Sequence, residues 1–236
     1  GRVAAGRGRA RIRVAMSDVT ARRARYVALG AAGVARAAIA AGLGVHFASL
    51  EMPSRQLYAR LLSDYVREAA VVPYSDFGRR IISGYQADLL RDANEVLKRA
   101  PLIVDEQSGQ GIEMICARAS LSRSRLAERG FKLGLIIVDY LQMIPLNMQF
   151  AGAPNIAVGM STKALKGLAK SLDVPIVLLS QLNRATESRD DKRPGLSDLR
   201  QSGEIEQDAD VVMFLYKGDE AYTQIMNIKL LVGKHR

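Results

Sequence analysis

Three short apolar runs constrain the fold of this chain more than any other feature. Residues 45–50, 133–138 and 174–179 are almost entirely apolar, and segments with the spacing of amphipathic helices lie between them. A strand that is apolar on both of its sides is typical of a parallel sheet covered on both faces. The sequence therefore predicts an α/β fold with a mainly parallel sheet and helices on both faces.

The remaining elements follow from periodicity and from turn residues. Helices are expected at residues 27–41, 53–68, 74–99 (as one or two helices), 112–129 and 161–172. Further strands are expected at 102–104, 211–216 and 224–232, with loops at 105–111, 145–159 and 183–204. Residues 1–26 alternate Arg, Ala and Gly without a clear period. We expect them to be a disordered arm, a basic tail on DNA or an anomalous segment, so that the domain spans 27–236.

The net charge of +10 suggests a polyanionic partner, but the charge is unevenly distributed. Residues 1–40 hold nine Arg against one acid, Asp18, which gives +8 and leaves +2 for the rest. The single cysteine, Cys116, rules out an internal disulfide and a cysteine metal cluster. We find no apolar run long enough to cross a bilayer, so we expect a cytoplasmic protein without a membrane partner.

Polar side chains follow the three apolar runs at the point where each expected strand ends. Glu51 follows the first, Asp139 the second, and the third leads into Ser180 and Gln181. Ligands of parallel sheets bind at this edge, and two carboxylates with an amide suit a site for phosphate and magnesium. The aspartate would hold the ion through water, the glutamate would deprotonate an attacking water, and the glutamine would contact the terminal phosphate. Acids also end strands simply because strands end at solvent, so this alternative stays open for each residue alone.

Five segments resemble, in the same order, the motifs of DnaB-type replicative DNA helicases. Residues 47–52 resemble the "SLEM" segment, 136–142 the Walker B strand, 179–184 the "SQLNR" motif, 192–210 the segment after it, and 233–236 the "GKxR" strand end. The resemblance covers roughly residues 42–236. It implies a RecA-like P-loop NTPase core that unwinds duplex DNA by moving along single-stranded DNA, 5′ to 3′, driven by ATP and Mg²⁺. It also implies that the chain lacks an N-terminal primase-contacting domain and the last strands of the fold.

The resemblance assigns a role to each matching residue. It makes Glu51 the catalytic base, Asp139 the residue that organises magnesium, and Gln181 the link between the γ-phosphate and the DNA-binding loops. It makes Lys234 and Arg236 a pair presented to the nucleotide of the neighbouring subunit, where positive charge stabilises the transferring phosphoryl group.

The resemblance also implies partners. The chain would form a homo-hexamer with ATP between subunits and single-stranded DNA in the central channel. Its protein partners would be primase and a helicase loader, and it would act at the nucleoid in the cytoplasm. The DNA would be held by loops resembling residues 146–160 and 186–204, where backbone phosphates need basic groups. The available side chains are Arg184, Arg189, Lys192, Arg193 and Arg200. A solvated charged loop is the alternative for this set.

The phosphate-binding loop G-x-x-x-x-G-K-[ST] of the family is missing from the expected position. Its lysine should fall near residues 26–28, but residues 21–28 contain neither Gly nor Lys. Arg25 is a candidate phosphate contact, although it would not restore the glycine turn. A lost or repurposed site, a shifted reading frame, and a divergent loop are three explanations, and we favour the first two. Reading the coding DNA in all three frames tests the second explanation.

Other functions therefore remain open beside the helicase motor. The chain could be a catalytically inactive RecA-like subunit that binds DNA or acts as a ring scaffold. It could also be a RecA-like recombinase that forms filaments, or an α/β domain of other purpose with a basic DNA-binding arm. Electron micrographs separate rings from filaments, and deletion of residues 1–26 tests the arm.

Overall fold

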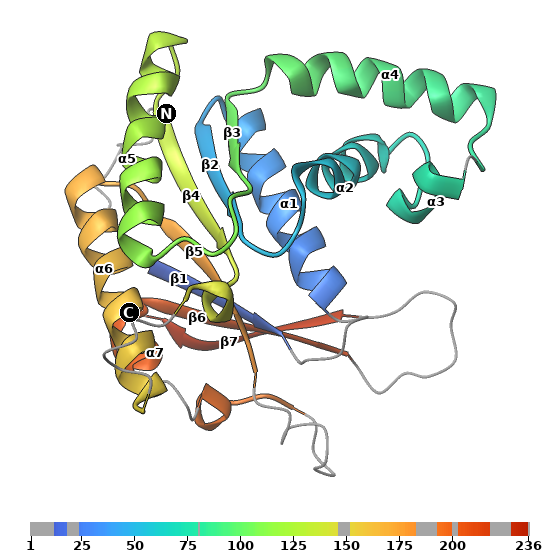
Figure 1. Cartoon of the computed structure of the whole chain (residues 1–236). Coiled ribbons are helices and arrows are strands. Elements are labelled where there is room, and N and C mark those ends of the chain that lie inside the picture. The colour runs from blue at the N-terminus through green and yellow to red at the C-terminus, as the bar shows by residue number, and fades with distance from the viewer. Residues whose placement is uncertain are drawn as a thin grey trace, which may run out of the picture.

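A seven-stranded sheet runs through the molecule in the order β3-β2-β4-β5-β1-β6-β7 (Figure 1). The computed structural model describes residues 12–17, 24–79, 81–145, 152–182, 193–199, 203–217 and 228–235. The strands are β1 (Ile12–Ser17), β2 (Gly44–Ser49), β3 (Leu102–Asp105), β4 (Leu133–Asp139), β5 (Ile176–Gln181), β6 (Val211–Lys217) and β7 (Ile228–His235). All pairs are parallel except β6 with β7, so the mainly parallel sheet is confirmed.

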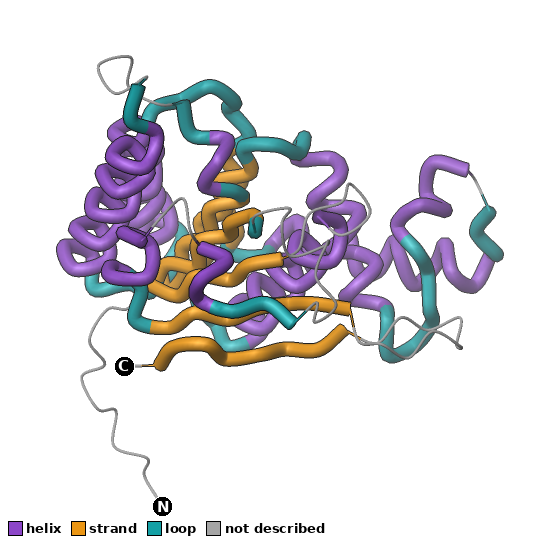
Figure 2. Tube along the Cα trace, turned by 90° about the horizontal axis from the view of Figure 1, so that it is seen from below, coloured by secondary structure: helices purple, strands orange, loops and turns teal. Residues whose placement is uncertain are grey.

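Helices cover both faces of this sheet, as Figure 2 shows from below. They are α1 (Ala24–Ala40), α2 (Ser54–Val66), α3 (Tyr74–Arg79), α4 (Gly84–Arg99), α5 (Ile112–Glu128), α6 (Pro154–Leu172) and α7 (Gly203–Asp208), with 3-10 turns η1 (Leu141–Met143) and η4 (Leu196–Leu199). None of the helices within the described ranges combines the length and apolar character needed to span a membrane.

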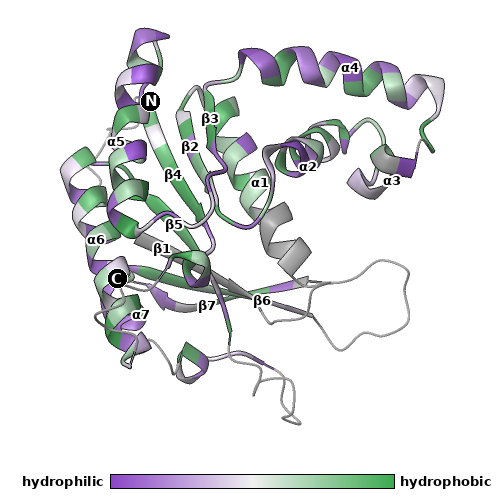
Figure 3. Ribbon diagram, in the orientation of Figure 1, coloured by the Kyte–Doolittle hydropathy of each residue, from purple (hydrophilic) through white to green (hydrophobic). Residues whose placement is uncertain are grey.

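Alternate residues of the central strands enter two separate cores. In β4, Ile136 packs in the core beneath α5 and α6, whereas Ile137 packs in the core beneath α1 and α2. Successive side chains of a strand point to opposite faces, so both faces must be apolar. The green colour of most of β4 in Figure 3 reflects this double burial. The α/β fold predicted from the apolar runs is confirmed.

The structure differs from the sequence prediction at residues 12–17, which were expected to lie in an arm outside the domain. They form β1, which lies inside the sheet and pairs in parallel with both neighbours, Ile12 opposite Ile176 and Arg13 opposite Val211. The domain therefore begins before residue 27. The strand is six residues long, and Arg13 interrupts its apolar pattern within an Arg-rich segment, so the sequence pattern does not identify it as a strand.

Two further boundaries are corrected. Helix α6 starts at Pro154, so residues 154–159, expected to be loop, form its first turns. Pro154 fits this position, because proline is well tolerated in the first turn of a helix, where its missing N–H is not needed. Strand β7 runs from Ile228 to His235 rather than over 224–232, and residues 218–227 lie outside the described part.

Candidate functional site

The structure brings Glu51, Asp139 and Gln181 to one edge of the sheet. Asp139 ends β4 opposite Ser49 of β2, and Gln181 ends β5, the next strand along. Glu51 follows β2 by two residues, in a turn joined to β4 by the Leu50 N–H, which donates to the Asp139 carbonyl at 2.8 Å. The clustering predicted from the strand ends is therefore present in the fold.

Asp139 is a buried carboxyl group whose ionised form is disfavoured. Only 5% of the residue is exposed, and burial raises the pKa of Asp139 to about 6. The charge of Glu51 raises this pKa further, while the Arg60 guanidinium acts in the opposite direction. Glu51 itself is exposed at the rim of the site. The two carboxylates are thus close enough to repel each other, which favours a cation beside them.

Gln142, which the sequence did not single out, fixes the end of β5. Its Nε2 donates to Ser180 Oγ at 2.9 Å and to the Gln181 carbonyl at 3.3 Å, and its Oε1 accepts from the Gln181 N–H at 3.1 Å. Burial and the Glu51 charge raise the pKa of Tyr140, and a hydrogen bond with the Gln181 side chain lowers it. Gln181 is therefore held from both its backbone and its side chain, beside the two acids.

Arg60 is a second residue that sequence reasoning missed. It lies on α2 with only 5% of its surface exposed, its guanidinium donates to Met52 Sδ, and it stacks 5.0 Å from the Tyr74 ring centroid. A signal was available, because Arg60 follows Leu57 by three residues and therefore lies on the buried face of an amphipathic helix. Its charge lowers the pKa of Asp139, so it partly offsets the repulsion from Glu51.

The connection from β1 to α1 occupies the place of a phosphate-binding loop. Ser17, the last residue of β1, pairs with Gln181, and α1 begins at Ala24. Phosphate loops of this type join a strand end to a helix N-terminus, where backbone N–H groups face the anion. Residues 18–23 lie outside the described part, but their sequence, Asp-Val-Thr-Ala-Arg-Arg, contains no glycine and no lysine. Arg25 is the second residue of α1.

These residues fit one half of a nucleotide site and not the other. Magnesium bound with nucleotides uses one or two carboxylates, waters and phosphate oxygens. Asp139 fits that role because it is a buried carboxylate beside a second acid. The described residues hold no group of three or more His, Cys, Asp or Glu that could bind a metal ion through protein ligands alone. The sequence between β1 and α1 does not fit a glycine-rich phosphate cradle.

The other candidate residues lie away from this edge or outside the described part. Lys234 pairs with Val212 at the start of β6, toward the edge of the sheet opposite the strand ends, and its amine donates to the Glu206 carbonyl. Lys234 is therefore not part of the cluster of acids at the strand ends. Arg193 is exposed just before η4. Arg184, Arg189, Lys192, Arg200 and Arg236 lie outside the described residues.

The strand order and the polar strand ends define the class of RecA-like folds. The chain belongs to the family described as the DnaB-like helicase C-terminal domain, whose model matches residues 22–236. The family and fold expected from the five motifs are therefore confirmed.

Relatives and solved structures agree with this assignment. The replicative DNA helicase DnaB of Rickettsia typhi is 38% identical over 180 residues, which is 76% of this chain and 34% of that protein. That of Buchnera aphidicola subsp. Acyrthosiphon pisum is 36% identical over 198 residues, or 80% and 40% of the two chains. This chain thus spans 34% to 40% of the length of these two relatives.

Two solved structures superpose with a TM-score of 0.79 over 97% of this chain. One, described as an ATPase domain, is 25% identical, with 78% of that chain covered. The other, a DnaB-like replicative helicase described with its interactions with primase, is 26% identical, with 53% covered. A KaiC-like protein from Pyrococcus horikoshii, at 12% identity and a TM-score of 0.55, shows the fold alone.

Proposed function

We propose that this chain is the ATP-driven motor of a replicative DNA helicase, which unwinds duplex DNA by moving along single-stranded DNA. The observation that carries the proposal is the pair of acids, Glu51 and Asp139, on neighbouring strand ends of a chain that belongs to the DnaB-like family. Bound ATP with Mg²⁺ would supply the phosphoryl group and the cation that offsets its charge.

The residues have separate roles in this proposal. Glu51 is exposed at the rim and takes the proton of the attacking water, while Asp139 holds the metal through water. Gln181 lies at the strand end that leads into residues 183–192, so it connects the terminal phosphate to the DNA-binding segment. Arg25 contacts phosphate from the first turn of α1.

The proposal extends to assembly and partners. Lys234 lies on the far side of the sheet from the acids, and we propose that Lys234 and Arg236 act on the nucleotide of a neighbouring copy in a homo-hexamer. Single-stranded DNA contacts a basic set in the loops, composed of Arg184, Arg189, Lys192, Arg193 and Arg200. A structural relative is described with its interactions with primase, which supports primase as a partner. We propose a helicase loader as a further partner and a location at the nucleoid in the cytoplasm.

The test is ATP hydrolysis with magnesium, with and without single-stranded DNA. DNA-stimulated turnover is expected, and Glu51→Gln should reduce kcat by about 100-fold or more because the base is lost. Glu68→Gln, at an exposed position just after α2, is the matched control and should keep full turnover. Equal turnover by the Glu51 variant and the wild type would refute the assigned base.

A second candidate function rests on the glycine-free connection after β1. In that case the chain is an inactive RecA-like ring or DNA-binding subunit without a working P-loop. A fluorescent ATP analogue that fails to bind, together with rings in negative-stain micrographs and no turnover, would support this candidate over the motor.

A further inference from the structure

The turn that carries Glu51 is fixed mainly through its backbone. Leu50 and Met52 are buried on either side of exposed Glu51, so its position depends on the chain that holds it. Ser49 Oγ donates to the Met52 carbonyl at 2.8 Å, and the Leu50 N–H donates to the Asp139 carbonyl. These contacts fix the entry to the turn, but its exit is the N-terminus of α2.

The N-terminus of α2 lacks a cap from its own sequence. The residue at the N-cap position is Pro53, which offers no side-chain acceptor, and the first turn contains no acidic residue. Helices normally satisfy these free N–H groups with a nearby Ser, Thr, Asp or Asn, and they favour negative charge at this end. The exit of the Glu51 turn therefore depends on a group from elsewhere in the chain.

Glu106 supplies that group from the loop after β3. Its Oε2 accepts a hydrogen bond from the backbone N–H of Ser54, the first residue of α2 and 52 positions earlier in the chain. This bond lowers the pKa of Glu106, because it stabilises the charged carboxylate. A distant carboxylate thus caps the helix that begins three residues after Glu51.

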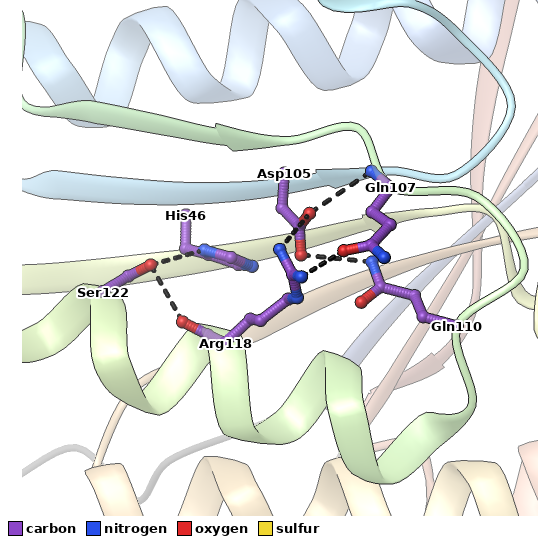
Figure 4. Close-up of polar contacts among 6 residues, drawn as sticks. All are labelled: His46, Asp105, Gln107, Gln110, Arg118 and Ser122. Atoms are coloured by element: carbon purple, nitrogen blue, oxygen red, sulfur yellow. Dashed lines mark hydrogen bonds and ion pairs between the residues drawn. The ribbon is translucent and has the colours of Figure 1, made fainter.

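The loop that presents Glu106 is anchored on its other side (Figure 4). The neighbouring Asp105, only 8% exposed, accepts from the Gln107 N–H at 3.3 Å, from Gln110 Nε2 at 3.1 Å and from Arg118 Nη1 of α5 at 3.3 Å. Arg118 Nη2 also donates to Gln107 Oε1. Both neighbours of Glu106 are therefore tied to α5, so this loop joins α5 to the start of α2.

We propose that Glu106 is a positioning residue, which holds the turn that carries Glu51. The inference rests on the proposed function, in which Glu51 is the base. Loss of the cap frees the exit of the turn, and an exposed side chain on a loosened turn spends less time in its productive orientation. Turnover then falls while nucleotide affinity changes little, because Glu106 does not belong to the phosphate or metal sites.

The test uses four variants of the full chain. Glu106→Ala removes the acceptor, and Glu106→Gln keeps a neutral one. Ser54→Pro deletes the donor yet suits a first helical position that follows the extended Pro53 (φ −59°, ψ 145°). Glu128→Ala, at an exposed site near the end of α5, is the control. Each is measured by amide hydrogen exchange over residues 49–57 and by steady-state ATP hydrolysis.

Glu106→Ala and Ser54→Pro should each make amide exchange over residues 49–57 about fivefold faster and lower kcat about fivefold. The KM of each variant should stay within about twofold of the wild-type value. Glu106→Gln should restore most of both quantities, and Glu128→Ala should change neither. Unchanged exchange in Glu106→Ala overturns the proposal, as does faster exchange with an unchanged kcat. A wild-type chain without turnover refutes the proposed function alone, and exchange then decides whether Glu106 holds the turn.

Discussion

His46 and Asp139 lie on neighbouring strands and should give the stability of this protein two opposing dependences on pH. Burial lowers the pKa of His46 from 6.5 to about 4 and raises the pKa of Asp139 from 3.8 to about 6. In both cases the folded protein favours the neutral form. The shift is about 2.5 pH units for His46 and about 2.2 for Asp139. One pH unit corresponds to about 1.36 kcal/mol, so the charged form of each group lowers the free energy of unfolding by about 3 kcal/mol.

The signs follow from proton uptake. Between pH 6.5 and 4, His46 takes up a proton only in the unfolded chain, so acidification destabilises the fold. Between pH 6 and 3.8, Asp139 takes up a proton only in the folded chain, so acidification stabilises the fold. In the wild type the two contributions largely cancel over this window. Asp139→Asn should therefore lose about 3 kcal/mol of unfolding free energy from pH 6.5 to 4, whereas His46→Asn should gain about 3 kcal/mol.

The assay is urea unfolding followed by circular dichroism at half-unit pH steps, with a chelator present because a bound cation would stabilise ionised Asp139. At pH 7, Asp139→Asn should be more stable than the wild type, again by about 3 kcal/mol. Asp92→Asn, at an exposed position of α4, is the control and should follow the wild-type profile. Parallel profiles for Asp139→Asn and the wild type would show that the carboxylate is well solvated, and would refute the reasoning.

Two more predictions concern packing and reactivity. A Cβ at Gly233 would overlap the ring of fully buried Phe214, so Gly233→Ala should lower the free energy of unfolding by about 1–3 kcal/mol. Gly167 lies in a helix with open space around it, so Gly167→Ala should raise the free energy of unfolding by about 0.5–1 kcal/mol in the same urea assay. Burial, with a smaller contribution from Glu113, raises the pKa of Cys116 to about 11, so iodoacetamide at pH 8 should label it about 100-fold more slowly in the folded protein than in urea. Equal labelling rates would show that the thiol is open to solvent.

The sequence was informative where burial leaves a pattern within a few residues. The runs at 45–50, 133–138 and 174–179 predicted β2, β4 and β5 because these strands are covered on both sides, and the polar residues after them predicted which side chains meet. Strand β1 was missed because its place between β5 and β6 comes from pairing with segments more than 150 residues away. No local pattern reports such pairing.

The contacts that support the site were missed for a related reason. The bond between Gln142 and the end of β5 spans 38 residues, and the bond between Glu106 and Ser54 spans 52. Neither pair has a spacing that one helix or one hairpin would bring together. Arg60 differs from these two pairs, because the helical spacing of the sequence alone places it on the apolar stripe of α2.

Two buried aspartates at strand ends show how a structural acid differs from a functional one. Asp105, at the end of β3, accepts hydrogen bonds from Gln107, Gln110 and Arg118, so its charge is offset within the fold. Asp139, at the end of β4, accepts no hydrogen bond at its carboxylate from the described residues, and it lies beside another acid with a raised pKa. A buried carboxylate left in this state destabilises the protein and is typical of sites that bind a cation or carry out proton transfer. The fold therefore provides two acids suited to the proposed nucleotide site, and the six residues between β1 and α1 decide whether the chain can bind a nucleotide there.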